Sequence, residues 1–458
     1  MPCSRMLLAI ACILVHSAVH GQTIGWRGDG TGTYPKANPP TEWGLDKNVA
    51  WKIAMPSFSV GTPVIVVDKI FTCSEPTTLV CLNKADGRIL WERKCLRSEI
   101  AWSEEDRRKL VDERAQDDTW AQEMRGAEQR VAKFEKAAKE SPEKAKEMRK
   151  DIDALRTQVS ALRAKRKSLS LLQRATEPYR DGTAGYSQCT PVSDGKRIYA
   201  MFGNGLVACF DLDGTRRWLT LMEHSTADYG HGSSPVLVGG RLIVHFADLV
   251  GLDVENGKES WRLKARPLHG TSIPATIDGV DVVVTPGGML VRASDGLVLA
   301  DKLGSCGDNA PIVHGNIVYF IAGSSVAVRL PAKIDEKPEQ LWKSSLKGGD
   351  YWFSSPVLRD GLIYAVNGNR NFNVLNAGTG KSVFSDRLEV EGRIYPSICS
   401  AGKFVFVSSD SGTTIVLEPG REYKEVARNQ LETFRSTPIF EGRRMYVRTQ
   451  KNLCCIGE

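Results

Sequence analysis

Polar and aromatic side chains are concentrated just before a proline that recurs along the chain. The proline stands at positions 191, 235, 274, 311, 356, 396 and 438, at intervals of 37 to 45 residues. The residues that precede it include two histidines, two arginines, two aspartates and several aromatics. If the fold brings these positions together, their chemistry suits a small polar or acidic ligand. The set is Tyr186, Asp228, Tyr229, His231, His269, Asp308, Asn309, Tyr351, Trp352, Arg393, Tyr395 and Arg435.

Three interpretations of this set remain open: a hydrogen-bonded plug, a ligand site and a catalytic site. His231 and His269 are zinc ligands by residue type, but no spacing motif accompanies them, so the metal content is left unknown. His245, within the apolar run IVHFA, is interpreted as a core histidine. No Ser-His-Asp order, nucleophile elbow or phosphate loop stands out. We therefore assign no catalytic residue.

A repeated unit must position these residues. The stretch 231–261, HGSSPVLVGGRLIVHFADLVGLDVENGKESW, contains short apolar runs at 236–238 and 242–246, a third run that reaches Leu252, and a turn at Asn256-Gly257. Four short strands in about 40 residues are typical of one propeller blade. An earlier copy begins at Pro63, which makes eight copies. The sequence predicts an all-β, eight-bladed β-propeller.

A tryptophan near the end of each copy provides a second landmark. It follows a glycine by four residues in Gly87/Trp91, Gly214/Trp218 and Gly257/Trp261. A large aromatic beside a bare glycine lets neighbouring blades stack closely. The tryptophans expected to dock blades are Trp51, Trp91, Trp218, Trp261 and Trp342.

The last copy, from residue 435 to 458, is too short to supply all its strands. We expect residues 50–53 to provide the missing strand, which would close the ring and remove an exposed sheet edge.

An insertion separates the first two copies. Ser103 with Asp106 resembles an N-terminal cap, and Ser141-Pro142 interrupts two charged, alanine-rich stretches. The second stretch carries a heptad seam that only Arg166 breaks. These features predict an antiparallel helical hairpin with arms of about 35 residues, or about 50 Å. The seam comprises Met148, Ile152, Leu155, Val159, Leu162 and Leu169, and the first arm offers Leu110, Ala121, Met124, Val131 and Ala138.

The hairpin is either a solvated arm packed beside the propeller or a surface that docks a protein partner. The stretch 156–174 contains no acidic residue, and its basic residues favour partner docking slightly. They include Arg163, Lys165, Arg166 and Lys167.

Composition limits the cellular setting. Sixty-one basic and 54 acidic residues give a net charge of +7, too small and dispersed to indicate nucleic acid as a partner. Residues 1–21 read as a secretory signal peptide, which predicts a periplasmic or extracellular protein. Lipoprotein anchoring through Cys12 is disfavoured because Ala9 replaces the usual large aliphatic residue. No other apolar run is long enough for a transmembrane helix.

The copy ends ACFDLDGTRRW (208–218) and GLDVENGKESW (251–261) resemble the repeats of the pyrroloquinoline-quinone (PQQ)-type propellers. That superfamily includes quinoprotein alcohol dehydrogenases and non-catalytic propellers such as the barrel-assembly lipoprotein of the bacterial outer membrane. The resemblance covers nearly all of the chain after residue 24 except the helical insertion. It implies the fold but does not specify an activity.

In the catalytic branch, the resemblance implies a quinone stacked between a tryptophan and a disulfide of adjacent cysteines, beside Ca²⁺. Trp352 would be the stacking floor, and Asp228, Asp308 and Asn309 would be Ca²⁺ ligands by residue type. Cys454-Cys455 departs from the family pattern, because period-two alternation sends the two side chains to opposite sheet faces. We expect two thiols there and do not carry the cofactor residues over.

The sequence therefore predicts a non-enzymatic binding or scaffold protein that contacts partners through the channel mouth and the hairpin. The alternative is a PQQ- and Ca²⁺-dependent dehydrogenase of alcohols or sugars; otherwise we expect no cofactor. The predicted divisions are a signal peptide (1–21), a lead-in with the ring-closing strand and first blade (22–102), the hairpin (103–175) and blades 2–8 (176–458).

Overall fold

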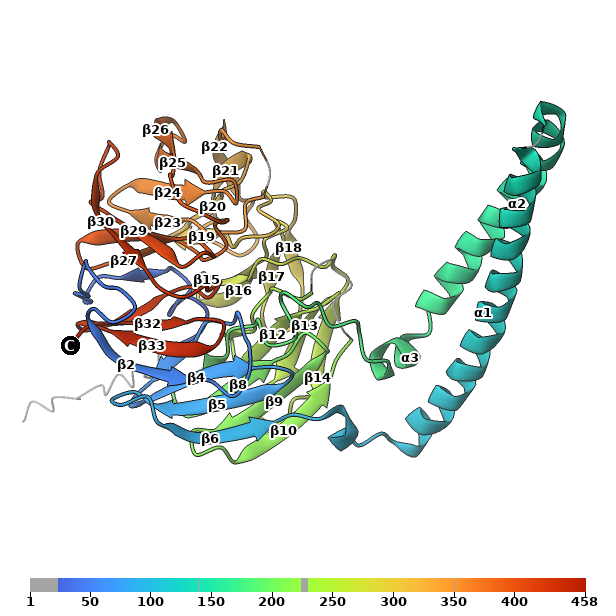
Figure 1. The fold of residues 1–458 in the computed structure, drawn as a ribbon, viewed down its shortest axis with the longest axis horizontal. Coiled ribbons are helices and arrows are strands. Elements are labelled where there is room, and N and C mark those ends of the chain that lie inside the picture. Colours follow the sequence, from blue (N-terminus) through green and yellow to red (C-terminus); the bar gives the residue numbers. More distant parts are fainter. Residues whose placement is uncertain (1–23, 140, 224–229, 350) are drawn as a thin grey trace, which may run out of the picture.

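In the computed structural model, eight β-sheets surround a common centre, and a long helical hairpin projects from their side (Figure 1). The structure describes residues 24–139, 141–223, 230–349 and 351–458. The predicted signal peptide lies outside these residues. Within them, no helix is long and apolar enough to cross a membrane.

Each sheet is one blade, with its strands ordered from the centre outward. Blades 1 to 4 are β3 (Val64–Val66), β4 (Lys69–Ser74), β5 (Thr78–Asn83), β6 (Ile89–Lys94); β7 (Val192–Ser193), β8 (Arg197–Met201), β9 (Leu206–Asp211), β10 (Arg216–Leu221); β11 (Val236–Val238), β12 (Arg241–His245), β13 (Leu249–Asp253), β14 (Glu259–Leu263); and β15 (Ile273–Ile277), β16 (Val280–Val284), β17 (Leu290–Arg292), β18 (Val298–Ala300).

Blades 5 to 8 complete the ring. They are β19 (Ile312–His314), β20 (Ile317–Phe320), β21 (Ser324–Arg329), β22 (Glu339–Ser345); β23 (Val357–Arg359), β24 (Leu362–Val366), β25 (Asn371–Asn376), β26 (Ser382–Arg387); β27 (Cys399–Ala401), β28 (Phe404–Ser408), β29 (Thr413–Leu417), β30 (Glu425–Gln430); and β31 (Ile439–Glu441), β32 (Arg444–Arg448), β33 (Asn452–Ile456), β2 (Val49–Ala54). A further strand, β1 (Thr33–Tyr34), joins blade 7 at its inner edge.

The outermost strand of blade 8 comes from the beginning of the chain. Strand β2 pairs antiparallel with β33, with Trp51 opposite Cys455. Blade 8 then packs on blade 1, where Tyr446 and Ile70 share one hydrophobic cluster. The prediction that residues 50–53 close the ring is confirmed.

The core lies between blades. In the described chain, eight hydrophobic clusters each combine residues from two adjacent blades. Cys454 belongs to the cluster between blades 7 and 8, whereas Cys455 belongs to the cluster between blades 8 and 1. Both thiols are free and buried, and burial raises the pKa of Cys454 to about 12 and that of Cys455 to about 11. The alternation of side chains along β33 thus separates the two sulfurs, as predicted.

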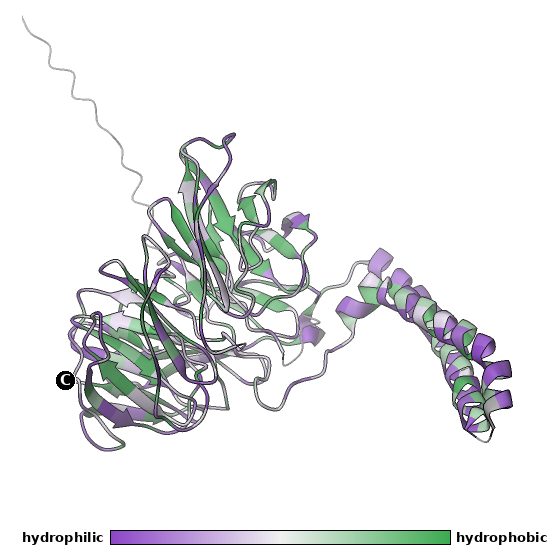
Figure 2. Cartoon of the chain, turned by 90° about the horizontal axis from the view of Figure 1, so that it is seen from above, coloured by the Kyte–Doolittle hydropathy of each residue, from purple (hydrophilic) through white to green (hydrophobic). Residues whose placement is uncertain are grey.

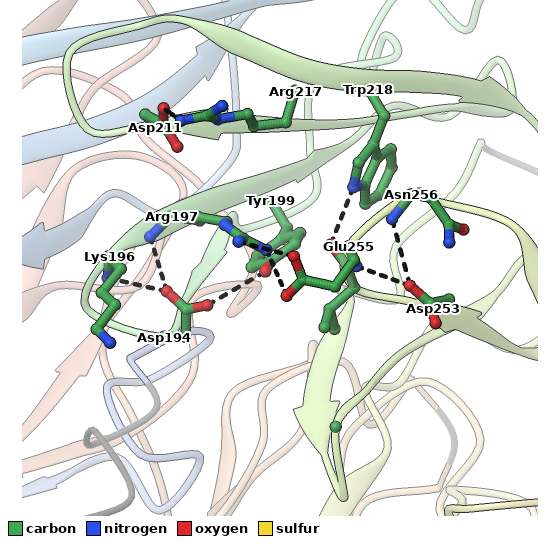
Figure 3. A network of polar contacts seen from close by, with 12 residues as sticks. Asp194, Lys196, Arg197, Tyr199, Asp211, Arg217, Trp218, Asp253, Glu255 and Asn256 are labelled. Atoms are coloured by element: carbon green, nitrogen blue, oxygen red, sulfur yellow. Dashed lines mark hydrogen bonds and ion pairs between the residues drawn. The ribbon is translucent and has the colours of Figure 1, made fainter.

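A tryptophan on an outer strand crosses to the next blade. The Trp218 Nε1 donates a hydrogen bond to the Val254 carbonyl at 2.9 Å, and its ring covers Gly257, where a Cβ atom would lie 2.5 Å from the ring (Figure 3). Trp91, Trp261 and Trp342 likewise donate to a carbonyl of the following blade. The bare glycine therefore belongs to the neighbouring copy, whereas the sequence pattern had paired each tryptophan with the glycine four residues earlier.

The insertion forms three helices: α1 (Glu104–Ala138), α2 (Pro142–Lys167) and α3 (Ser170–Ala175). The Ser103 Oγ accepts a hydrogen bond from the Asp106 N–H, and the Ser141 Oγ accepts one from Lys144. The seam packs Leu155 and Val159 against Ala127. In Figure 2 the strands are mainly hydrophobic, whereas purple and green alternate along the projecting hairpin. The second arm is shorter than expected because it ends at Lys167 and resumes as α3.

Several basic side chains of the hairpin are engaged by the facing helix. Arg166, the residue that breaks the heptad, makes two hydrogen bonds of 2.6 and 2.9 Å to the Asp117 carboxylate. Arg163 pairs with Glu128 at 2.8 Å, and the Lys165 ammonium lies 5.8 Å from the centre of the Trp120 ring. α1 thus supplies a carboxylate for Arg163 and for Arg166 and an aromatic ring for Lys165, so these three side chains are engaged within the hairpin although no acidic residue occurs between 156 and 174.

Candidate functional site: a closed cavity at the channel mouth

A ring of small hydroxyl residues surrounds the mouth of the channel. One such residue stands just before the inner strand of most blades, where its oxygen accepts a hydrogen bond from a backbone N–H of the preceding blade. Among the described residues, six such hydrogen bonds of 2.9 to 3.2 Å run from the N–H of Thr190 to Ser234, Ser234 to Thr271, Ala310 to Ser355, Ser355 to Ser397, Ser397 to Thr437 and Thr437 to Thr62. The ring fixes the spacing between the loops that carry the candidate residues.

These links also show which positions are equivalent between blades. Ser234 N–H donates to Thr271, so Thr271 is the counterpart of Ser234. Pro274 lies three residues later, inside β15, and pairs with Val283. The recurring proline is thus displaced in blade 4, and the hydroxyl residue marks the repeat more regularly.

The N-terminal segment crosses the channel. Ile24 forms a β-bridge with Ser193 of blade 2, whereas Thr33 and Tyr34 pair in parallel with Ser400 and Ala401 of blade 7. Between them, the buried Arg27 donates a hydrogen bond to the Ile398 carbonyl at 2.6 Å. A chain that contacts blades on different sides of the axis closes the channel below the mouth.

The mouth of the channel forms a cavity of about 580 Å³ that is open to solvent at its entrance. Trp26, on the crossing segment, contributes its floor, and loops before the inner strands form its walls. This volume is within the range of small-molecule sites. The residues that line it with side chains of chemical interest are Trp26, Asp181, Gln188, His269, Asp308, Tyr351, Phe353, Arg393, Tyr395 and Arg435.

One wall combines aromatic rings with two arginines. Phe353 and Tyr395 stack with their ring centroids 5.0 Å apart and an interplanar angle of 16°. The Arg435 guanidinium lies 4.1 Å from the centre of the Tyr395 ring, and the Arg393 guanidinium lies 5.7 Å from that of Tyr351. Such cation–π contacts hold the guanidinium groups without using their N–H donors.

The loops of other blades bring Asp181, Asp308, His269 and Gln188 to the cavity. Asp181 is already engaged, since its Oδ1 accepts hydrogen bonds of 2.8 Å from the N–H groups of Thr183 and Ala184. Asp308 is exposed. No group of three or more His, Cys, Asp or Glu side chains arranged for a metal occurs in the described part of the chain.

Six of the predicted residues line the cavity: His269, Asp308, Tyr351, Arg393, Tyr395 and Arg435. Four others were wrongly placed there, because successive side chains in an extended loop point in opposite directions. Asn309, next to Asp308, is buried and donates to the carbonyls of Ile321 and Trp352 at 3.0 and 2.9 Å. Trp352, next to Tyr351, packs in the core between blades 5 and 6.

The remaining two corrections are Tyr186 and His231. The Tyr186 hydroxyl donates to the Pro178 carbonyl, and its ring belongs to the core between blades 1 and 2. His231 is buried against Phe246, with ring centroids 4.7 Å apart. Asp228 and Tyr229 lie outside the described residues.

Trp26, Gln188, Phe353 and the hydroxyl ring were missed by the sequence analysis. Phe353 carried a usable signal, because it is an aromatic residue in the same short loop before the recurring proline as Tyr351. Trp26 carried none, since its place depends on how the N-terminal segment passes through the channel.

The residues nominated for a quinone site do not fit that group. The Trp352 Nε1 donates to the Gly349 carbonyl at 2.7 Å, and its ring is within the inter-blade core. Asn309 uses both amide hydrogens on backbone carbonyls, and the two adjacent cysteines face different blades. Of the residues described, only Asp308 stands at the cavity as the catalytic branch would require.

Comparisons with known proteins give a consistent family. A family model described as outer membrane protein assembly factor BamB matches residues 44–135 and 152–333. Outer membrane protein assembly factor BamB of Yersinia pestis is 25% identical over 263 residues, which cover 50% of this chain and 66% of that protein. The chain thus spans slightly less than two thirds of this curated relative.

Two solved structures are among those similar to this chain. A europium-containing methanol dehydrogenase has a TM-score of 0.56 and 10% identity, with 92% of this chain and 89% of that chain covered. BamB from Moraxella catarrhalis has a TM-score of 0.46 and 13% identity, with 58% and 83% covered. The first of these likenesses shows the propeller fold and nothing about activity.

Proposed function

This chain belongs to the family described as outer membrane protein assembly factor BamB, and we propose that it is a non-enzymatic binding protein that assists the assembly of outer membrane proteins. The observation that carries the proposal is the family match over residues 44–135 and 152–333, which includes β2, blades 1 to 4 and the first three strands of blade 5. We place the protein in the periplasm, where the predicted signal peptide would deliver it.

The contact surfaces that we propose are the channel mouth and the hairpin. Hydrogen bonds at the base of the hairpin attach it to the propeller. Arg97 donates to the carbonyls of Asn204 and Arg174, and Arg216 donates to the Glu99 carboxylate at 2.9 and 3.0 Å. An arm that projects beyond the blades can reach a partner while the ring remains intact (Figure 1).

The test is depletion of the protein in the cell that produces it, followed by quantitative mass spectrometry of the outer membrane fraction. We expect the abundance of several outer membrane β-barrel proteins to fall and to recover when the wild-type gene is restored. Unchanged abundance of every such protein after complete depletion would contradict the proposal.

The dehydrogenase alternative needs a separate test. The purified protein is incubated with PQQ and Ca²⁺, desalted, and examined by visible absorbance and by a dye-linked assay over alcohols and sugars. We expect no turnover, because Trp352 and Asn309, the residues nominated to stack the quinone and to bind Ca²⁺, are committed to the core. Stoichiometric retention with turnover would favour the enzyme.

A further inference from the structure

We infer that the cavity at the channel mouth binds a small planar carboxylate, with the ring of the ligand against the aromatic wall and its anion at Arg393. This inference concerns a small ligand and does not rest on the proposed role in outer membrane assembly. It follows from three properties of the cavity: its closure, its aromatic wall and its uncommitted donors.

The N-terminal segment closes the cavity at one end, so that the cavity is a pocket and not a passage through the ring. The crossing segment is fixed at both ends, by the Ile24 bridge to Ser193 and by the pairing of β1 with β27. Trp26 on this segment faces a space of about 580 Å³ that is also bordered by the hydroxyl ring. A ligand that enters from the mouth therefore meets a floor and can lose much of its contact with water.

The aromatic wall selects a planar ligand. Tyr351 and Phe353 have ring centroids 5.9 Å apart at an angle of 42°, and Phe353 stacks on Tyr395. Tyr351 is half exposed, at 52%, so apolar ring surface is still available to a ligand. Flat aromatic surfaces gain more from a planar partner than from a puckered one, because planar groups adopt the stacked and edge-to-face arrangements that rings prefer.

Arg393 supplies the charge for the anion. Its guanidinium lies against Tyr351, and no hydrogen bond or ion pair from its side chain occurs among the described residues. Arg435 is partly committed, with its Nη2 3.5 Å from the Asp410 carboxylate. A guanidinium group with free N–H donors beside an aromatic surface suits a carboxylate, which it can bind through two parallel hydrogen bonds.

Gln188 gives an independent sign of an absent acceptor. Its Nε2 is buried, and no acceptor for it occurs in the part of the chain that the structure describes. Buried donors normally have a partner, so an orphaned amide in a cavity wall indicates a polar group that the ligand would supply. The two carboxylates of the cavity stand on other loops than Arg393: Asp181 accepts two backbone hydrogen bonds, and Asp308 is exposed, so the anion is assigned to Arg393 and not to their side of the cavity.

The experiment is isothermal titration calorimetry of the full-length mature protein with three probes: 2-naphthoate, 2-naphthamide and cyclohexanecarboxylate. We expect 2-naphthoate to bind, and the neutral amide and the non-planar acid each to bind at least about tenfold more weakly, as expected for the loss of a charge-assisted hydrogen bond or of ring stacking. Absence of 2-naphthoate binding at millimolar concentration would overturn the inference.

Variants locate the site. Arg393→Gln and Phe353→Leu should each weaken 2-naphthoate binding about tenfold or more. The matched control is Arg421→Gln, which removes an exposed arginine between β29 and β30, away from the cavity. Because Arg393 is exposed, its variant should keep the circular dichroism spectrum of the wild type. Equal affinity of the wild type, Arg393→Gln and Phe353→Leu would overturn the assignment even if the probe binds.

Discussion

At the scale of single residues, burial decides whether a polar side chain is structural or available to a ligand. His231 is only 1% exposed, and neither ring nitrogen has a hydrogen-bond partner among the described residues. Burial, with a smaller effect of His245 and His269, holds its pKa at about 3. It is therefore a neutral, packed ring near neutral pH, whereas Arg393 and Tyr351 on the following loops remain accessible.

We predict that the free energy of unfolding decreases as the pH falls from about 6.5 towards 3. In this window the unfolded chain protonates His231 and the folded chain does not, so protons favour unfolding by up to about 1.4 kcal/mol per pH unit for this group. The stabilisation is complete above the unfolded pKa and is lost progressively below it.

Urea unfolding of the wild type and of His231→Phe at pH 7, 5.5 and 4 measures this effect. The phenylalanine should retain the contact with Phe246 and reduce the slope with pH, leaving a residual slope from His245, whose pKa burial also lowers. His314→Gln, at an exposed histidine, is the control and should leave the slope unchanged. An unaltered slope in His231→Phe would contradict the assignment.

At the scale of the blades, the indole of one sheet requires a glycine in the next. Trp218 lies on Gly257, Trp261 on Gly296 and Trp342 on Gly380, with 2.4 to 2.6 Å between the ring and a Cβ placed there. Polar contacts also join the two sheets at the Trp218 junction: Arg197 of blade 2 binds the Glu255 carboxylate of blade 3 through two hydrogen bonds of 2.8 Å (Figure 3). Each junction therefore depends on residues from two copies of the repeat.

We predict that Gly257→Ala destabilises the protein by about 2 kcal/mol more than Gly240→Ala. Both glycines have φ of +71°, so both variants incur the same backbone strain. Only at position 257 does the new methyl group overlap an indole, while nothing lies within 4 Å at position 240. Equilibrium unfolding in urea gives the free energy of unfolding of both variants. If both lose the same free energy of unfolding, the Trp218 ring moves aside without destabilising the protein, and the prediction is wrong.

At the scale of the whole molecule, the ring and the hairpin are stabilised by separate sets of contacts. The ring closes through β2 and the clusters between blades, and the N-terminal segment crosses its channel from blade 2 to blade 7. The hairpin has its own small core around Leu155 and its own ion pairs. Its root contacts blade 2 through Arg97 and Glu99, which precede α1.

We predict that replacement of residues 104–169 by a short Gly-Ser linker leaves the propeller folded. The thermal midpoint should change by only a few degrees, because no inter-blade cluster loses a residue. Differential scanning calorimetry measures the midpoint, and far-UV circular dichroism confirms the loss of helix. If the hairpin carries the partner contact, this variant should also fail to restore outer membrane protein abundance after depletion, whereas Arg421→Gln should restore it fully.

Much of the fold was predictable because its signals are local. Strands of period two, turn glycines and the helix caps at Ser103 and Ser141 all act between residues a few positions apart. Counting strands also identified residues 50–53 as the missing strand, since a closed ring must pair its last edge. The direction of the two cysteine side chains on β33 followed from the same alternation.

The sequence by itself determined the repeat, the eight blades, the ring closure and the presence of a helical hairpin. Only the tertiary structure decided that Asp308 faces the cavity while Asn309 faces the core, that Trp26 forms a floor, and that Asp117 neutralises Arg166. The physical reason is that propensity and periodicity act along the chain, whereas the direction of a loop side chain and the partner of a charge are set by packing between segments that are distant in sequence.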